Sequence, residues 1–266
     1  MDPLQGEVVA EHAATLTHRV SAVLFLVLPG LGMIFAATQL GASRAEERVW
    51  LAGSGILFAA LGALAVAQQG KSRVLVHSDG VERWGLRGKL WELTWRDAVE
   101  LRYRVIKVRL GGLLGMLLPA LGTNIHIALV DSSGKVYKLP ANLKGMDVLA
   151  ERVVDQQTAA HFPAARTKID AGEEIRFGKY LALDKEKISA RKLFGGFKTC
   201  PLGEIEKVSV VGGFLKIRQK RKTFAFTTTA AAQIPNVFIL LRLLESLTGK
   251  KDTLHDRDFS SQAYVG

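Results

Sequence analysis

Two long apolar runs near the amino end place the strongest constraint on what this chain can fold into. Residues 20–40 and 49–68 contain no charged side chain, and the polar stretch GASRAEER separates them. A helix rises 1.5 Å per residue, so about 20 residues cross the roughly 30 Å hydrocarbon core of a bilayer. Because the connection is short, the two helices must be antiparallel. The sequence therefore predicts a transmembrane hairpin over residues 19–69, preceded by an N-terminal tail over residues 1–18.

Small side chains recur at every fourth position of the second apolar run. They form a predicted helix-packing stripe of Gly55, Ala59, Ala63 and Ala67. Such a stripe lets another helix approach closely. Packing against the first apolar run is the preferred interpretation, and contact with a second copy of the chain, giving a homo-oligomer, is the alternative.

Charge separates the hairpin from the rest of the chain. The formal net charge is +11, and the excess of Lys and Arg lies after residue 70. Basic side chains near the spans favour the side shared by both ends of the hairpin, with Arg19, Lys71, Arg73 and Arg83 there against Arg44 and Arg48 in the loop. Positive charge marks the cytoplasmic side, and a single cysteine fits a reducing compartment. We therefore expect a multi-pass protein of the cell inner membrane with a cytoplasmic C-terminal body.

The body contains an internal duplication. The passage VLVHSDGVERWGLRGKLWELTWRDAVEL, from Val74, aligns without a gap with LALDKEKISARKLFGGFKTCPLGEIEKV, from Leu181. Both passages consist of short apolar runs joined by polar or glycine-bearing turns, which indicates antiparallel strands. Further alternating stretches, GKVYKLP and RKTFAFT, each precede an amphipathic helix, over residues 145–157 and 234–247.

This pattern predicts an α+β, mainly β body of two units. Each unit has about six short antiparallel strands closed by one helix, and the units cover residues 70–159 and 173–249. The intervening residues 160–172 are expected to be a linker. The polar end, residues 250–266, is expected to be a flexible tail.

At this level the chain resembles bacterial pleckstrin-homology-like (PH-like) membrane proteins. The resemblance covers residues 71–249 and rests on Asp79, Gly80, Trp95, Arg96 and Asp97, a DG turn after the first strand and a W-x-D step into the fourth. The second copy departs from it, with Glu186, Lys187, Leu202, Gly203 and Glu204 in those places. The resemblance implies a transmembrane hairpin followed by two tandem PH-like domains, each a strand meander or barrel closed by a C-terminal helix. A fold of this kind does not by itself specify a function.

An uncharged stretch, LGGLLGMLLPALG (residues 110–122), interrupts the first unit where the second has only VGG. We interpret it as a loop that dips into the lipid headgroup boundary or lies against the hairpin helices. The expected membrane-contact residues are Leu113, Leu114, Met116, Leu117 and Leu118. The alternatives are packing against the second unit or another subunit, and burial within the loop's own unit.

Two basic clusters occupy matching hairpins of the two units. They are predicted to contact an anionic surface and comprise Arg102, Arg104, Lys107 and Arg109 in the first unit, and Lys216, Arg218, Lys220, Arg221 and Lys222 in the second. Each such charge contributes on the order of 1 kcal/mol near an anionic bilayer. A solvated sheet face is the alternative for both clusters.

No catalytic, cofactor-binding or metal-binding pattern accompanies these features. The six histidines and Cys200 show no ligand spacing, and the tryptophans Trp84, Trp91 and Trp95 fit core packing better than a stacking platform for nucleic acid. We therefore expect a membrane-anchored, non-catalytic scaffold in contact with the phospholipid bilayer, which recruits or regulates a protein partner. The alternatives are an accessory subunit of a channel or transporter, and a sensor of anionic lipid.

Overall fold

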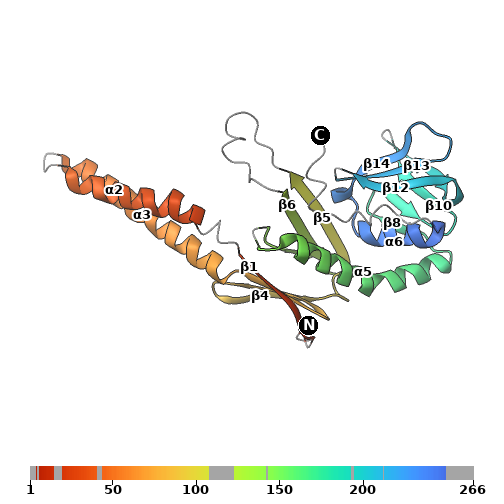
Figure 1. Cartoon of the computed structure of the whole chain (residues 1–266), viewed down its shortest axis with the longest axis horizontal. Coiled ribbons are helices and arrows are strands. Elements are labelled where there is room, and N and C mark those ends of the chain that lie inside the picture. Colours follow the sequence, from red (N-terminus) through yellow and green to blue (C-terminus); the bar gives the residue numbers. More distant parts are fainter. Residues whose placement is uncertain are drawn as a thin grey trace. The chain divides into compact units, whose positions relative to one another are not determined.

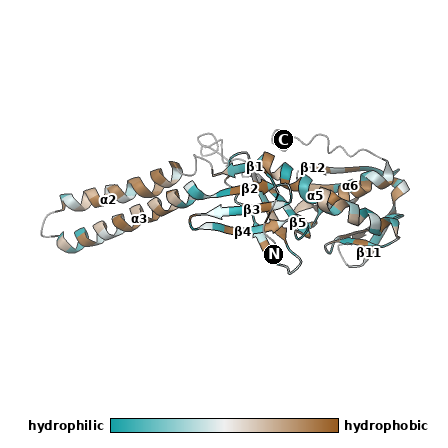
Figure 2. Ribbon diagram, turned by 90° about the horizontal axis from the view of Figure 1, so that it is seen from below, coloured by the Kyte–Doolittle hydropathy of each residue, from teal (hydrophilic) through white to brown (hydrophobic). Residues whose placement is uncertain are grey.

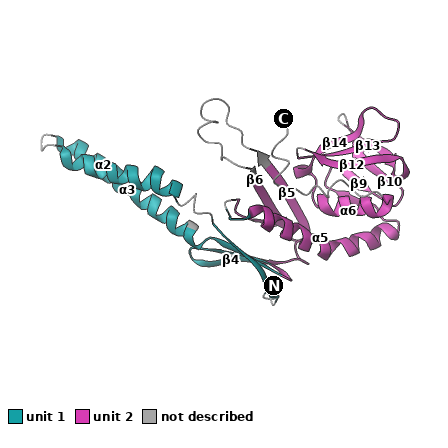
Figure 3. Ribbon diagram, in the orientation of Figure 1, with its two compact units in different colours: residues 1–77, 81–92, 142–145 teal, residues 78–80, 93–141, 146–266 magenta. Residues whose placement is uncertain are grey.

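A computed structural model of the chain divides into two compact units, which are described separately (Figure 3). Unit 1 comprises residues 1–77, 81–92 and 142–145, and unit 2 comprises residues 78–80, 93–141 and 146–266. The residues that the structure describes are 4, 6–14, 20–40, 44–107, 123–141, 143–192, 195–211 and 213–249.

Unit 1 contains two apolar helices that run side by side (Figures 1 and 2). The first is helical over Val20–Gln39 and comprises a π-helical turn, η1 (Val23–Val27), and α2 (Leu28–Gln39). The second is α3 (Ala45–Lys71). Both are long and apolar enough to cross a membrane, and only 17% and 11% of their spans are buried. Their outer surfaces therefore consist largely of apolar side chains without protein cover.

The π-helical turn η1 ends two residues before Pro29. Proline has no backbone N–H, and its ring collides with the carbonyl four residues earlier, here that of Phe25. A π turn widens the helix and is a common way to absorb such a defect. The first helix thereby continues past Pro29.

The first strand of unit 1 lies ahead of the helices. Residues 1–18 were expected to be a tail, yet β1 (Val8–Ala13) pairs antiparallel with β2 (Arg73–His77). With β3 (Gly80–Gly85) and β4 (Gly88–Thr94), these strands form a four-stranded sheet in the order β1-β2-β3-β4. The helical hairpin is therefore an insertion between two adjacent, hydrogen-bonded strands.

The pairing continues up to the base of the hairpin. Ala13 is in register with Arg73, and the Ala14 amide donates to the Ser72 carbonyl at 3.1 Å. Only Ser72 separates the last residue of α3 from β2. The second helix is thus joined to the sheet with almost no intervening chain.

Unit 2 contains a three-stranded sheet in the order β5-β6-β7. It comprises β5 (Glu100–Lys107), β6 (Thr123–Val130) and β7 (Val136–Lys138). Alternate side chains of these strands are buried, including Leu101, Tyr103, Ile127 and Leu129. Arg102, Arg104, His126 and Lys138 are exposed at intervening positions, so one face of the sheet is apolar and the other carries these hydrophilic side chains.

The same order of elements then repeats. A four-stranded sheet in the order β11-β10-β9-β8 comprises β8 (Ile175–Phe177), β9 (Leu181–Leu183), β10 (Lys187–Arg191) and β11 (Phe197–Pro201). A three-stranded sheet follows, with β12 (Ile205–Val211), β13 (Phe214–Gln219), β14 (Ala225–Ala230) and a final helix, α6 (Val237–Thr248). Single 3-10 turns, η3 (Leu202–Glu204) and η4 (Ala231–Gln233), precede β12 and α6. Each half of the body therefore has four strands, three strands and a helix, where the sequence predicted about six strands.

The second half has one continuous core. Leu183 and Ile188 from its four-stranded sheet, Leu215 and Ile217 from its three-stranded sheet and Leu240 from α6 are all fully buried in it. A shared cluster of this kind is what defines a single hydrophobic core.

A long helix, α5 (Met146–Asp170), runs through the segment predicted to be a linker (residues 160–172). Its first half buries Leu149 and Val153, whereas Ile169 near its end belongs to the core of the second half. Gly172, at a φ of +83°, follows the end of the helix in the left-handed conformation typical of helix C-termini. One helix is therefore shared by the two halves of the body.

Candidate functional site

The two apolar helices approach each other closely at glycine residues. A Cβ atom placed on Gly55 would lie 2.6 Å from the Gly30 carbonyl oxygen, and one on Gly30 would lie 2.7 Å from the Ala59 nitrogen. A Cβ on Gly62 would lie 2.7 Å from Val27 Cγ2. The contact line on α3 is therefore Gly55, Ala59 and Gly62.

The predicted stripe coincides with this line only at its start. Gly55 is buried and Ala59 half-buried, whereas Ala63 and Ala67 are exposed. A step of four residues along an α-helix turns by about 40° more than one full turn, so the predicted stripe drifts around α3. A step of seven residues falls about 20° short of two full turns, so Gly62 lies on nearly the same side of α3 as Gly55. The intrachain contact thus leaves Ala63 and Ala67 on the open surface of α3.

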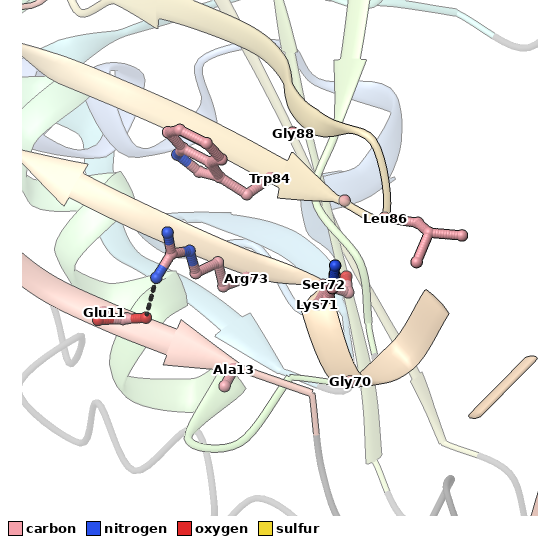
Figure 4. A pocket seen from close by; sticks show the side chains of 10 residues that line it. Glu11, Ala13, Gly70, Lys71, Ser72, Arg73, Trp84, Leu86 and Gly88 are labelled. Carbon is pink, nitrogen blue, oxygen red and sulfur yellow. Dashed lines mark hydrogen bonds and ion pairs between the residues drawn. The ribbon is translucent and has the colours of Figure 1, made fainter. Parts of the chain in front are cut away.

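A pocket of about 380 Å³ lies where α3 passes into the sheet, and we call it the hairpin-base pocket (Figure 4). Arg73 is one of the residues that line it. Its guanidinium forms an ion pair with Glu11 at 3.3 Å and lies 5.1 Å from the centre of the Trp84 ring. Lys71, the last residue of α3, also lines the pocket. Tryptophan and basic side chains are the residue types enriched where a membrane span meets water.

The first basic cluster lies partly within the described residues. Arg102 and Arg104 are exposed on β5 and line a cavity of about 610 Å³, together with His126 and Lys138 from the two neighbouring strands. We call this cavity the basic groove. The side chain of Lys107 and the whole of Arg109 lie outside the described residues, as does the predicted membrane-contact loop 110–122. Sequence reasoning missed His126 and Lys138 because only the strand register brings them beside the arginines.

The second basic cluster lies on β13 and the turn that follows it. Lys216 is half-buried and Arg218 exposed, and Lys220 donates from Nζ to the Gly203 carbonyl at 2.7 Å. Arg221 and Lys222 are exposed in the turn, where Arg221 has a φ of +57°. The structure thus distributes these five cations along a strand and its turn rather than around a cavity.

A network of hydrogen bonds joins the two halves of the body at Asn236. Its Nδ2 donates to the Val99 carbonyl at 2.9 Å, while its Oδ1 accepts from the Leu101 amide at 2.7 Å and from Gln157 Nε2 at 3.1 Å. The Asn236 amide also donates to the Leu101 carbonyl at 2.9 Å. Asn236 has a φ of +54°, a left-handed conformation that asparagine tolerates better than most residues.

Replacing Asn236 should therefore weaken the junction between the halves. We expect Asn236→Ala to lower stability by about 2–4 kcal/mol, because three side-chain hydrogen bonds are lost and alanine is strained at this φ. Asn236→Gly loses the same bonds without the strain and should be less harmful by about 1 kcal/mol. Urea unfolding of the full chain in detergent, followed by circular dichroism, measures both variants. A wild-type midpoint for Asn236→Ala would contradict this role.

Cys200 lies in the core of the second half and does not present a reactive thiol. It is fully buried, and burial, with a smaller effect of the Glu204 charge, raises the pKa of its thiol. A raised pKa leaves less of the nucleophilic thiolate at neutral pH. Within the described part of the chain, no group of three or more His, Cys, Asp and Glu side chains could hold a metal ion.

Native Cys200 should therefore resist alkylation. We expect iodoacetamide at pH 8 to modify it at least roughly a hundredfold more slowly in the folded chain than in urea, because the thiol reacts only when the core opens. The matched control is Thr199→Cys in a Cys200→Ser background, which places a thiol at the neighbouring exposed position. Equal labelling rates for the two thiols, measured by mass spectrometry, would show that this core is open.

Together these features define a protein with an apolar helical hairpin and a body of several antiparallel sheets. The chain belongs to a family of unknown function, DUF6585, whose model matches residues 5–252. Comparison with curated proteins and with solved structures found no match.

Proposed function

We propose that the protein is a membrane-anchored, non-catalytic scaffold that presents two PH-like domains at the cytoplasmic face of the inner membrane and recruits or regulates a protein partner there. The observation that carries this proposal is the insertion of the apolar hairpin between β1 and β2. Two adjacent, paired strands can flank the hairpin only if both of its ends emerge on the same side of the bilayer. The sheet is thereby attached to the membrane at two points.

The order of elements supports the PH-like assignment. Each half of the body has four strands, then three strands, then one helix, which is the arrangement expected of a strand meander closed by a C-terminal helix. In the first half the hairpin replaces the turn between the first two strands. In the second half that turn is Gly178, Lys179 and Tyr180.

The hairpin-base pocket supports the membrane position. Lys71, Arg73 and Trp84 surround the point where the apolar surface of α3 ends. Side chains of these types hold the end of a span at the headgroup level, because their apolar parts contact lipid while their polar ends remain hydrated. The sheet would then begin directly at the membrane surface.

A second candidate function is an accessory subunit of a larger membrane assembly. It is favoured by the small, exposed side chains of Ala63 and Ala67, which leave part of α3 open to another helix. Native mass analysis in detergent distinguishes the two, because a stable oligomer or a co-purifying membrane protein favours the assembly.

The proposed function is tested by chemical crosslinking in native membranes followed by identification of the neighbours. We expect the protein to stay with the membrane during alkaline carbonate extraction, to be released by detergent, and to crosslink to a cytoplasmic protein. Release by carbonate alone would contradict the anchor, and crosslinks restricted to proteins outside the cytoplasm would contradict the orientation.

A further inference from the structure

The basic groove has an ordered arrangement of cations on the hydrophilic face of the sheet β5-β6-β7. Strand register places Arg102 opposite Ala128 and Ala128 opposite Lys138, so these three residues form a row across the sheet. In the adjacent row, Arg104 lies opposite His126. Strands lie about 4.8 Å apart and alternate residues about 7 Å apart, so the four nitrogen-bearing side chains surround the small methyl group of Ala128.

The space around Ala128 is open, and none of the described residues that line it carries a carboxylate. The cavity measures about 610 Å³, within the range that small ligands fill. Its other wall comes from Ala230, Ala232 and Gln233, which belong to the end of β14 and to η4. These contribute two methyl groups and an amide, so the groove combines a positive side with a neutral one.

The two arginines of the groove differ in their acidic partners. Arg102 Nε donates to Glu100 Oε1 at 2.6 Å. Arg104, in contrast, has no acidic partner within 4 Å among the residues that the structure describes. Guanidinium groups present planar pairs of donors that match a phosphate oxygen pair, and an ammonium group adds a point charge. The arrangement therefore suits an anion with several oxygens better than a single carboxylate.

We propose that the basic groove binds a phosphate-bearing ligand, with the phosphate over Ala128, the guanidinium groups of Arg102 and Arg104 on one side and Lys138 on the other. His126 and the Gln233 amide can donate further hydrogen bonds. Either a soluble phosphorylated compound or a phospholipid headgroup supplies this chemistry. The site goes beyond the scaffold role and does not depend on whether the hairpin lies in a membrane.

The test uses the full chain in phosphatidylcholine nanodiscs, titrated with inorganic pyrophosphate in a calorimeter at low salt. We expect saturable binding. A second titration uses nanodiscs that also contain phosphatidic acid. Weaker apparent pyrophosphate affinity there identifies the lipid headgroup as the competing ligand, whereas unchanged affinity identifies a soluble ligand, and both results support a phosphate site.

Two variant pairs locate the binding. The double variant Arg102→Gln/Arg104→Gln should weaken pyrophosphate binding at least about tenfold, because charge-assisted hydrogen bonds are lost. The matched control Arg191→Gln/Lys192→Gln removes two exposed charges from β10 and the adjoining turn and should leave the affinity within about twofold. Ala128→Glu should abolish pyrophosphate binding. Ala128→Gln, whose side chain has the shape of glutamate without its charge, should retain part of it.

Folding of every variant is checked by the resistance of Cys200 to alkylation. Three results would overturn the proposal: no binding to the wild-type chain, equal losses in the groove and control double variants, or equal effects of glutamate and glutamine at position 128. Each of these outcomes leaves the crosslinking test of the scaffold role unaffected.

Discussion

Replacing residues 14–72 with the three-residue turn Gly-Lys-Tyr should convert the protein into a water-soluble one with an intact β1-β2 pair. In the second half of the body, residues 178–180 join β8 to β9, and Phe177 pairs with Leu181. In the first half, Ala13 pairs with Arg73 at the equivalent place. The pairs Ala13–Arg73 and Phe177–Leu181 are each the last antiparallel pair before the connection between the two strands. The three-residue turn should therefore keep β1 and β2 in their present register.

The matched control for this replacement is a chain that starts at Arg73. It also lacks the apolar helices, but it loses β1 and therefore leaves the edge of β2 unpaired. We expect it to aggregate, because an uncovered edge strand is a template for pairing between molecules. Ultracentrifugation after lysis without detergent and circular dichroism of the soluble fraction measure both chains. Equal solubility of the two would contradict a structural role for β1.

Substituting Gly55 by leucine should force the two apolar helices apart. A Cβ atom at this position would lie 2.6 Å from the Gly30 carbonyl oxygen, a backbone atom that cannot rotate away. We expect a loss of at least about 1–3 kcal/mol in helix association, which is the usual range for overpacking. Two spin labels, at Val20 and Gln68 in a Cys200→Ser background, report the separation of the helix ends away from the loop. The distance distribution should broaden and shift outward by a few ångströms.

Gly53 provides the control within the same helix. A Cβ atom there would meet nothing within 4 Å, and leucine has a higher helix propensity than glycine by as much as about 1 kcal/mol. Gly53→Leu should therefore leave the label distance unchanged. If both variants moved the labels equally, the close approach of the helices at Gly30 would not hold the hairpin together.

The features that could be predicted from the sequence are those with a local or periodic signal. Two uncharged runs long enough to span a bilayer indicated the helices, and the aligned passages from Val74 and Leu181 indicated the repeated sheets. Of the three tryptophans expected in the core, Trp95 is buried, whereas Trp84 and Trp91 are only half-buried. The Trp95 backbone amide donates to the Asp79 carbonyl at 2.9 Å. Hydrophobic burial and tight turns act over a few residues, so short patterns carry them.

The features that were missed depend on contacts distant in the sequence. The stretch VVAEHA shows no strong alternation, and its partner β2 lies beyond the whole hairpin, so nothing local identifies β1. The end of α5 contains Pro163 and many polar residues, which favoured a linker, but Phe162, Ala165 and Ile169 pack on the second core and keep this segment helical. Tertiary packing overrides propensity in both cases.

The basic groove could be predicted from the sequence only in part, for the same reason. Arg102 and Arg104 are two residues apart on one strand, so a shared face could be predicted for them. His126 and Lys138 join them only through the pairing of β5 with β6 and of β6 with β7. Cross-strand register depends on turn geometry and on the buried face together, and a single sequence does not specify it.

The position of the hairpin within the sheet also imposes an order on biogenesis. The ribosome synthesises β1 before either apolar helix and β2 only after both, so the first strand can pair with β2 only once the whole hairpin has been made. If the nascent helices entered the bilayer with only one crossing, β1 and β2 would be left on opposite sides and could not pair. If the hairpin spans a bilayer as proposed, β1 and β2 can therefore pair only when both helices have crossed it.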